Sequence, residues 1–168
     1  VPSMKKEEQV AVSFIGAGNY ATRMLIPAFK EAGVRLRTVT SSGGVSGVHA
    51  GQKFGFEQTT TDVNSVYSDE DTNVVVIATR HDSHAMMVIA ALKAGKNVFV
   101  EKPLAINILD LEKIRKFIQE EKSSFLMVGF NRRFSPHISE LKSKLSSEKS
   151  PKSIIITINP GQIVKDHW

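Results

Sequence analysis

The sequence predicts an α/β fold in which a doubly wound parallel sheet carries helices on both faces. Three observations predict it. Strand-like segments that are apolar throughout alternate with amphipathic helical segments, which is typical of a parallel sheet covered on both sides. The first such strand leads directly into a glycine-rich turn that opens a helix. The 168 residues, 41% of them hydrophobic, suffice for one full domain and part of a second.

The expected elements follow from hydrophobic periodicity and from the residues that begin and end them. Strands are expected at residues 10–15, 34–40, 73–78, 98–100 and 125–128. Helices are expected at residues 19–32, 49–54, 63–67, 82–94 and 107–121. Glycine ends three of these helices, at positions 33, 55 and 95, and Asp62 and Asn107 are suited to cap the start of two others. The apolar side of the first helix is expected to consist of Met24, Leu25, Ala28 and Phe29.

The pattern changes after Gly129. Residues 135–145 are expected to be helical, 146–153 to form a polar linker, and 154–158 to form a β-branched strand without a partner in the remaining length. The chain stops at Trp168 with no element finished, which indicates truncation. We therefore expect a leader at 1–9, a doubly wound domain at 10–130, and the truncated start of an α+β domain at 131–168.

Composition excludes several classes of function. The formal net charge is +5, but lysines and arginines are scattered among acidic residues, which does not indicate a nucleic-acid surface and suits an anionic small ligand. The absence of cysteine excludes disulfides and thiolate metal sites. No segment has the length and apolarity of a signal peptide or a membrane span. We expect a cytoplasmic protein that binds neither nucleic acid nor membrane.

The glycine-rich turn predicts a dinucleotide site. Residues 16–21 read GAGNYA, a GxGxxA motif between a strand and a helix. Gly16 permits the tight turn, Gly18 lets the backbone approach a diphosphate, and Ala21 lets helix and strand pack closely. The anion then lies at the helix N-terminus, beside Asn19 and Tyr20. We therefore expect an NAD(P)-binding Rossmann domain at 10–130; a glycine turn without a ligand is the alternative.

The end of the second strand bears on the choice between NAD and NADP. An acidic residue there binds the adenosine ribose diol in many such folds. This chain has Ser41 and Ser42 instead, so a 2′-phosphate is not repelled. Both cofactors stay open. Arg37 or Arg23 is a candidate to receive the phosphate, and ordinary surface charge is the alternative for each.

Polar residues follow three successive strands of the predicted sheet. They are Thr79, Arg80, His81, Asp82, Ser83 and His84 after one strand, Glu101, Lys102 and Pro103 after the next, and Asn131, Arg132 and Arg133 after the last. Ligands of a doubly wound sheet bind outside the carboxyl ends of its strands. We therefore expect the three segments to converge on one crevice.

Lys102 is the candidate catalytic residue. A lysine beside a cofactor and partly out of water can hydrogen-bond a substrate hydroxyl and take its proton as hydride leaves carbon. Pro103 stiffens the backbone that aims the side chain, and the bond that precedes it is a candidate for the cis form. The alternative is an exposed lysine at the end of a strand.

The remaining polar residues allow several roles. His81 and His84 are three residues apart at a helix start and lack a third partner, so no metal site is predicted. Capping or hydrogen bonding near a nicotinamide ring is one role for them, and an ordinary surface or core role is the other. Arg132 and Arg133 suit a phosphate or carboxylated substrate, or ordinary interdomain salt bridges.

Four segments resemble the glucose-fructose oxidoreductase / inositol dehydrogenase family (Gfo/Idh/MocA): FIGAGNYA, VVVIATRHDSHA, ALKAGKNVFVEKPLA and VGFNRRFSP. The resemblance covers the chain up to about Pro136. It implies an N-terminal Rossmann domain that holds NAD or NADP, followed by an α+β domain that carries the sugar or cyclitol site and often oligomerises. It also implies that Lys102 is the catalytic lysine and that Thr79, His81, His84 and Glu101 line the nicotinamide half of the cofactor.

The chain departs from the family at the missing acid of the second strand and at Arg80, where the family often has proline. The tail INPGQIVKDHW also resembles a subgroup fused to a zinc alcohol-dehydrogenase-like segment. The resemblance implies a dehydrogenase acting on a secondary alcohol or ketone of a sugar, cyclitol or nucleotide sugar, homo-oligomeric at full length and inactive as this fragment. A non-catalytic dinucleotide sensor and another Rossmann enzyme, such as a methyltransferase, are the alternatives.

Overall fold

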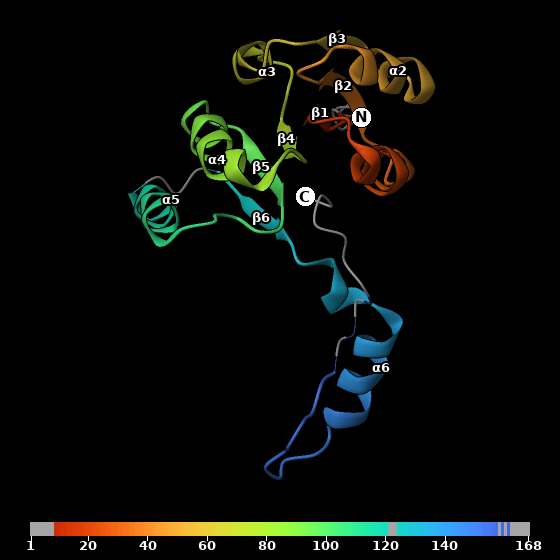
Figure 1. Cartoon of the computed structure of the whole chain (residues 1–168), viewed down its shortest axis with the longest axis vertical. Helices are drawn as coiled ribbons and strands as arrows, with labels where there is room; N and C mark the ends of the chain where they lie inside the picture. Colours follow the sequence, from red (N-terminus) through yellow and green to blue (C-terminus); the bar gives the residue numbers. More distant parts are fainter. Residues whose placement is uncertain (1–8, 121–123, 158, 160, 162–168) are drawn as a thin grey trace, which may run out of the picture. The chain divides into compact units, whose positions relative to one another are not determined.

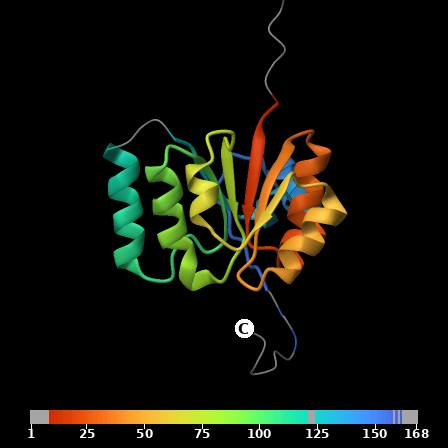
Figure 2. The ribbon, with the colours of Figure 1, turned by 90° about the horizontal axis from the view of Figure 1, so that it is seen from above.

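A computed structural model describes residues 9–120, 124–157, 159 and 161. The chain divides into two compact units, Val1–Phe130 and Asn131–Trp168 (Figure 1). In the first unit, helices cover both faces of a single sheet. Helices α1 and α2 lie on one face and α3, α4 and α5 on the other (Figure 2).

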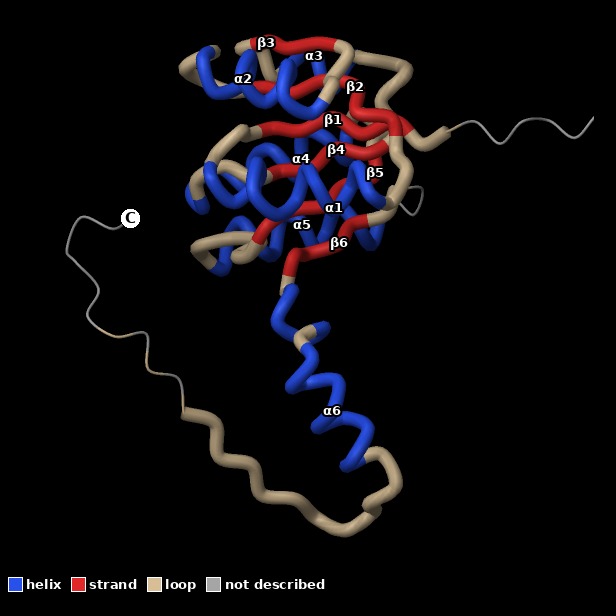
Figure 3. The backbone as a smooth tube through the Cα atoms, turned by 90° about the vertical axis from the view of Figure 1, so that its right-hand side faces the viewer, coloured by secondary structure: helices blue, strands red, loops and turns tan. Residues whose placement is uncertain are grey.

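The sheet contains six parallel strands in the order β3-β2-β1-β4-β5-β6 (Figure 3). The strands are β1 Ala11–Ile15, β2 Arg35–Thr40, β3 Gln58–Thr60, β4 Val74–Ile77, β5 Asn97–Glu101 and β6 Leu126–Gly129. The direction of winding reverses between β1 and β4, which is the point where a doubly wound sheet binds its ligand. The doubly wound α/β prediction is confirmed. Strand β3 was not predicted, because its three residues are polar and give no hydrophobic signal.

The helical elements of the first unit alternate with these strands. They are the π-helical turn η1 Ala21–Leu25, α1 Ile26–Glu31, α2 Val45–Phe54, α3 Asn64–Ser68, the 3₁₀ turn η2 His81–Ser83, α4 His84–Lys93 and α5 Ile108–Glu120. Asn107 caps α5 as predicted, because its Oδ1 atom accepts from the N–H of Asp110 at 2.9 Å. The N-cap position of α3 is Val63 rather than Asp62; the Asp62 Oδ1 atom accepts from the N–H of Asn64 at 2.9 Å in the turn before the helix. Position 121, the predicted end of α5, lies outside the described residues.

Two apolar clusters hold the layers together. On one face, Phe14 is fully buried and makes edge-to-face contacts with Phe29 and Phe56 at centroid distances of 5.5 and 5.7 Å. On the other face, Val88 of α4 and Ile114 of α5 are buried against the sheet. Burial of each apolar side chain of this size contributes about 1.5–3 kcal/mol to the free energy of unfolding.

The helix predicted at residues 19–32 is divided into η1 and α1, because Pro27 cannot donate a backbone hydrogen bond. The N–H of Ile26 donates to the carbonyl oxygen of Ala21, five residues earlier, so the turn before the proline is wider than an α-helical turn. The buried side of this segment consists of Ala21, Leu25 and Ile26. The predicted apolar side is wrong at Met24, which is 58% exposed, and at Ala28, which is also exposed.

Asparagine side chains continue the hydrogen-bond ladder at the amino ends of the strands. The Asn73 Oδ1 atom accepts from the N–H of Ala11 at 2.8 Å, and the Asn97 Oδ1 atom accepts from the N–H of Phe125 at 2.9 Å. The Asn97 side-chain amide also donates to the carbonyl oxygen of Asn73 at 3.4 Å. Strands β1, β4, β5 and the residue before β6 are thus joined at this edge.

The second unit contains the 3₁₀ turn η3 Asn131–Phe134 and helix α6 Pro136–Leu145. The Ser135 hydroxyl caps α6 by accepting from the N–H of Ile138 at 3.4 Å. The predicted strand at 154–158 is not formed over the described residues 154–157, because no paired strand lies beside them; residue 158 lies outside the described part. Within the described ranges, no helix combines the length and apolarity needed to cross a membrane.

Candidate functional site

A cavity of about 570 Å³ lies over the carboxyl end of β1. The glycine turn forms its floor, Ser42, Ser46 and Thr61 line it beyond β2 and β3, and Thr79 and Arg80 line it beyond β4. This position coincides with the reversal of strand order. It is therefore where a doubly wound sheet accommodates a dinucleotide.

The glycine turn fits a diphosphate. Gly16 has a φ of +104°, and a β-carbon at this position would overlap the carbonyl oxygen of Ala78. The N–H of Gly16 donates to the carbonyl oxygen of Thr40 at 3.0 Å, which fixes the turn to β2. A β-carbon on Gly18 would meet no atom within 4 Å, so the backbone there faces open space. Asn19 and Tyr20 follow Gly18, are exposed, and do not line the cavity.

The two serines after β2 have different surroundings. Ser41 is buried, and its Oγ atom accepts from the N–H of Gly47 at 2.9 Å, inside the first turn of α2. Ser42 is exposed and lines the cavity. Helix α2 begins at Val45, earlier than predicted, and this brings Ser46 to the cavity as well. Asp82 is the only acidic residue among those that line the cavity, and it lies on the β4 side.

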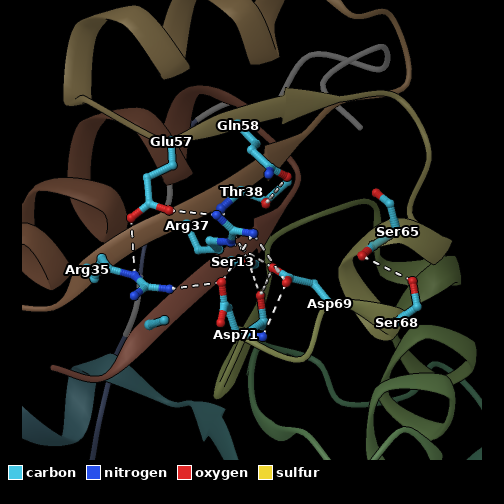
Figure 4. A network of polar contacts seen from close by, with 12 residues as sticks. Ser13, Arg35, Arg37, Thr38, Glu57, Gln58, Ser65, Ser68, Asp69 and Asp71 are labelled. Carbon is cyan, nitrogen blue, oxygen red and sulfur yellow. Dashed lines mark hydrogen bonds and ion pairs between the residues drawn. The ribbon is translucent and has the colours of Figure 1, made fainter. Parts of the chain in front are cut away.

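Arg37 belongs to an ion-pair network away from the cavity lining (Figure 4). Its Nε atom lies 2.9 Å from Asp69 Oδ2, and its Nη1 atom lies 2.7 Å from Glu57 Oε2. The hydrogen bond from Arg37 lowers the pKa of the Asp69 carboxyl. The hypothesis that Arg37 receives a 2′-phosphate is wrong, because these carboxylates already hold its guanidinium. Arg23 is exposed and does not line the cavity either.

Hydroxyl contacts fix the segment after β4. The Oγ1 atom of Thr79 and the Oγ atom of Ser83 are 2.7 Å apart, and the Ser83 hydroxyl donates to the carbonyl oxygen of Arg80 at 2.7 Å. Thr79 and Arg80 therefore line the cavity from a turn that the hydroxyl groups of Thr79 and Ser83 stabilise.

His84 is the last residue of this segment and the first residue of α4. Its ring is fully buried and does not line the cavity. The Nδ1 atom lies 2.7 Å from the carbonyl oxygen of Pro103, and the Nε2 atom lies 3.2 Å from the carbonyl oxygen of Thr79. The ring of His81 packs edge-to-face on that of His84 at a centroid distance of 5.7 Å.

Glu101 and Lys102 stand at the carboxyl end of β5, next to β4. Glu101 Oε2 accepts from the backbone N–H of Lys102 at 3.3 Å, whereas its buried Oε1 atom has no hydrogen-bond partner among the described residues. Burial raises the pKa of the Glu101 carboxyl. The Lys102 side chain is exposed and does not line the cavity, so the expectation that it lies partly out of water is not met in this chain. The Lys102–Pro103 peptide bond is cis.

Two of the three predicted strand-end segments lie in the first unit. The segments after β4 and β5 meet at His84. Asn131, Arg132 and Arg133 belong to the second unit, whereas the cavity belongs to the first. Sequence reasoning missed Ser46 and Thr61, because the start of α2 and the polar strand β3 that place them gave no periodic signal. No group of three or more metal-ligating side chains occurs in the part of the chain that the structure describes.

A family model matches residues 10–130, which is most of the first unit. Its description is "Oxidoreductase family, NAD-binding Rossmann fold", and its name is Gfo/Idh/MocA. The matched range contains the glycine turn, the cavity and the segments after β4 and β5.

Individual relatives agree with this match. Myo-inositol 2-dehydrogenase of Thermotoga maritima is 32% identical over 64% of this chain and 32% of its own length. Levoglucosan dehydrogenase of Pseudarthrobacter phenanthrenivorans is 39% identical over 55% of this chain and 24% of its own length. The crystal structure of myo-inositol dehydrogenase from Lactobacillus casei with NAD(H) and myo-inositol has a TM-score of 0.76 and 27% identity, covering 83% of this chain and 42% of that one. The chain thus spans well under half the length of each of these relatives.

Proposed function

Because the chain belongs to the Gfo/Idh/MocA oxidoreductase family, with its NAD-binding Rossmann fold, we propose that it is the cofactor-binding part of an NAD(P)-dependent dehydrogenase. The substrate is a secondary alcohol or ketone of a sugar, cyclitol or nucleotide sugar. The observation that carries the proposal is the glycine turn, where Gly16 is packed against β4 and Gly18 faces open cavity. Relatives named for inositol and levoglucosan support this substrate class.

The cavity would hold the adenosine and diphosphate parts of the cofactor. The glycine turn would hold the diphosphate, and Ser42, Ser46 and Thr61 would face the adenosine ribose. Thr79 and Arg80, on the other side of β1, would lie toward the nicotinamide half. A bound nicotinamide would supply the site that accepts or donates hydride.

Lys102 is the proposed acid-base residue. It would hydrogen-bond the reacting hydroxyl of the substrate and hold or release its proton through Nζ. The exposure of Lys102 in this chain is consistent with a site that the rest of the protein completes, since the relatives are about twice as long. The fragment alone should therefore bind cofactor and turn over little substrate.

The absence of an acidic residue at the end of β2 supports acceptance of NADP as well as NAD. A 2′-phosphate at this end would meet the hydroxyls of Ser42 and Ser46 rather than a carboxylate. Asp82 lies on the opposite, β4 side of the cavity. We therefore propose that the chain does not exclude NADP.

The experiment for the proposed function uses the full-length protein and a panel of polyols, with NAD(P)H formation as the readout. Lys102→Ala should lower kcat by at least about a hundredfold, the scale of acid-base catalysis. An unchanged output would instead favour a non-catalytic dinucleotide sensor. Thermal shifts of the 168-residue chain with NAD, NADP and S-adenosylmethionine separate a dehydrogenase from a methyltransferase, because only a ligand of the folded state raises its stability.

Four further expectations stay predictions. Residues 131–168 would begin an α+β domain, the complete protein would form homo-oligomers, and its location would be cytoplasmic. The fusion to a zinc alcohol-dehydrogenase-like segment rests on the tail 158–168, most of which lies outside the described residues. The gene's flanking coding sequence, gel filtration of the full-length protein and its cellular localisation are the corresponding tests.

A further inference from the structure

His84 has an unusual pair of partners. Its ring is fully buried at the first residue of α4, and each ring nitrogen faces a backbone carbonyl oxygen. One carbonyl belongs to Thr79, which follows β4 and lines the cavity. The other belongs to Pro103, which follows Lys102 directly. A single side chain therefore connects the wall of the cavity to the backbone next to Lys102.

We propose that His84 is a positioning residue that holds Glu101 and Lys102 in a fixed place beside the cofactor cavity. The proposal rests on the proposed function only for what the cavity binds. The His84 side chain does not line the cavity. It acts on Glu101 and Lys102 through the backbone carbonyls of Pro103 and Thr79. This differs from the expectation that the His84 side chain lines the nicotinamide half.

The hydrogen-bond chemistry assigns the direction of the contact. Carbonyl oxygens only accept, so a ring nitrogen must carry a proton to bind either of them. A neutral imidazole has one N–H, and the shorter contact, 2.7 Å against 3.2 Å, assigns that proton to Nδ1 and its acceptor to Pro103. Only a ring protonated on both nitrogens donates to Thr79 as well. The bond to Pro103 is therefore present both in the neutral ring with its proton on Nδ1 and in the ring protonated on both nitrogens.

Several contacts hold the segment after β5: Glu101 pairs with Gly129 of β6, and Leu104 and Ala105 pack against the core. The His84 bond is the contact that joins this segment to the wall of the cavity. Strand β5 pairs with β4 as far as Val100 opposite Ile77, so the ladder between these two strands stops before Lys102. Glu101 supplies a second restraint by accepting from the N–H of Lys102 at 3.3 Å. Beyond these contacts, the Lys102 side chain is exposed. Without the His84 bond, the backbone that carries Lys102 loses its tie to the cavity wall.

Two substitutions of His84 test the contributions of its two ring nitrogens one at a time. The side-chain amide nitrogen of asparagine occupies about the place of Nδ1, and that of glutamine occupies about the place of Nε2. His84→Asn should therefore keep the bond to Pro103, whereas His84→Gln should keep only the contact with Thr79. Val88→Ala serves as the control, because Val88 is buried in the same helix and its apolar side chain cannot hydrogen-bond to the carbonyls of Thr79 or Pro103.

The first experiment compares the affinities of NADH and ADP-ribose for the 168-residue chain. ADP-ribose lacks only the nicotinamide ring, so a displacement of Glu101, which is expected at the nicotinamide half, should affect NADH alone. We expect His84→Gln to weaken NADH binding about fivefold, the size of one hydrogen bond, and to leave ADP-ribose binding unchanged. His84→Asn and Val88→Ala should keep the wild-type ratio of the two affinities. Equal losses for both ligands in His84→Gln, or an unchanged ratio, would overturn the proposal.

The second experiment needs neither a ligand nor a variant. Long-range ¹H–¹⁵N spectra of the ¹⁵N-histidine-labelled chain show which ring nitrogen of His84 is protonated. We expect a proton on Nδ1; an imidazole protonated only at Nε2 would contradict the proposed bond. If the wild-type chain binds neither NADH nor ADP-ribose, the proposed function fails, and these spectra still decide the role of His84.

Discussion

The carboxylate of Glu101 rests against Gly129, its paired residue on the neighbouring strand β6. A β-carbon built on Gly129 would lie 2.7 Å from Glu101 Oε1 and 3.1 Å from Phe99 Cζ. Glycine therefore leaves the space in which this carboxylate is buried, and Oε1 has no hydrogen-bond partner among the described residues. Burial raises the pKa of the Glu101 carboxyl.

Gly129→Ala should push the Glu101 carboxylate toward water. The carboxylate is the end of a flexible side chain, so the free energy of unfolding should change by no more than about 1 kcal/mol. The pKa of Glu101 should fall toward its ordinary value, because the desolvation is relieved. A pH titration of the carboxyl ¹³C resonance measures this. Val128→Ala, on the same strand, is the control and should leave that pKa in place; an equal pKa in Gly129→Ala would refute the expectation.

Glu101→Gln should remove a pH-dependent cost of folding. A carboxyl whose pKa is raised in the folded state costs stability above that pKa, and the cost vanishes below the unfolded-state value of about 4.3. The wild-type chain should therefore lose this part of its stability as pH rises from about 4 through the raised pKa. The variant should not. Urea unfolding over a pH series measures the difference, which should grow with pH; parallel profiles would count against the burial of Glu101.

Arg37→Met should make Asp69 an unpaired, largely buried carboxylate and lower the stability at neutral pH. The pKa of Asp69 is depressed by the hydrogen bond from Arg37, so its contribution is present above the unfolded-state value of about 3.9 and is lost as pH falls through the folded-state value. The acid-induced loss of stability should therefore be smaller in Arg37→Met than in the wild-type chain.

Arg35→Met is the matched control for that variant. Arg35 pairs with Glu57 and Asp71 in the same network, but its side chain is 37% exposed against 18% for Arg37. Exposed ion pairs contribute little. Thermal unfolding should rank the chains as wild type, Arg35→Met, Arg37→Met from most to least stable, and the reverse order of the two variants would be inconsistent with the network as described.

Gly16→Ala and Gly18→Ala should separate folding from binding. Alanine at position 16 combines a φ of +104° with overlap on the Ala78 carbonyl, so it should cost at least about 2 kcal/mol of stability. Alanine at position 18 meets no neighbouring atom and should change stability by less than about 0.5 kcal/mol. It should nevertheless weaken NAD(P)H binding at least about tenfold, because its methyl group enters the diphosphate site. Fluorescence titration gives the affinity, and undiminished binding by Gly18→Ala would disprove the site.

Ser42→Asp should shift the cofactor preference toward NAD. A carboxylate at the end of β2 repels a 2′-phosphate and accepts from a ribose diol, so the affinity for NADP should fall at least about tenfold relative to NAD. Ser41→Ala is the control: it removes the acceptor of the Gly47 N–H and should cost about 1 kcal/mol of stability without changing the ratio of the two affinities. The same shift from both variants would show that Ser42 is not the residue that faces the ribose.

The sequence was sufficient for five of the six strands, for the doubly wound class and for the position of the glycine turn, but not for the polar strand β3. Long apolar runs and glycine at helix ends are local signals, and the glycine turn requires a ligand-binding strand end in this fold. The surroundings of single side chains were not predictable in this way. Ser41 and Ser42 are neighbours, yet only the start of α2 decides which one is buried. His84 was expected at the cofactor, and only the structure shows that its two ring nitrogens face backbone carbonyl oxygens of the segments after β4 and β5 instead.

The side-chain hydrogen bonds of Asn73 and Asn97 restrain the amino ends of the strands more than the carboxyl ends are restrained. Side-chain amides of Asn73 and Asn97 supply partners for backbone groups that the strands alone leave open. At the opposite rim, where the cavity lies, the N–H of Ala78 donates to the carbonyl oxygen of Ile15, and the described residues show no side-chain amide bridge between β1 and β4 there. Local opening should therefore start at the ligand-bearing rim, and amide protons there should exchange with solvent fastest in the apo chain and slow most when the cavity is filled.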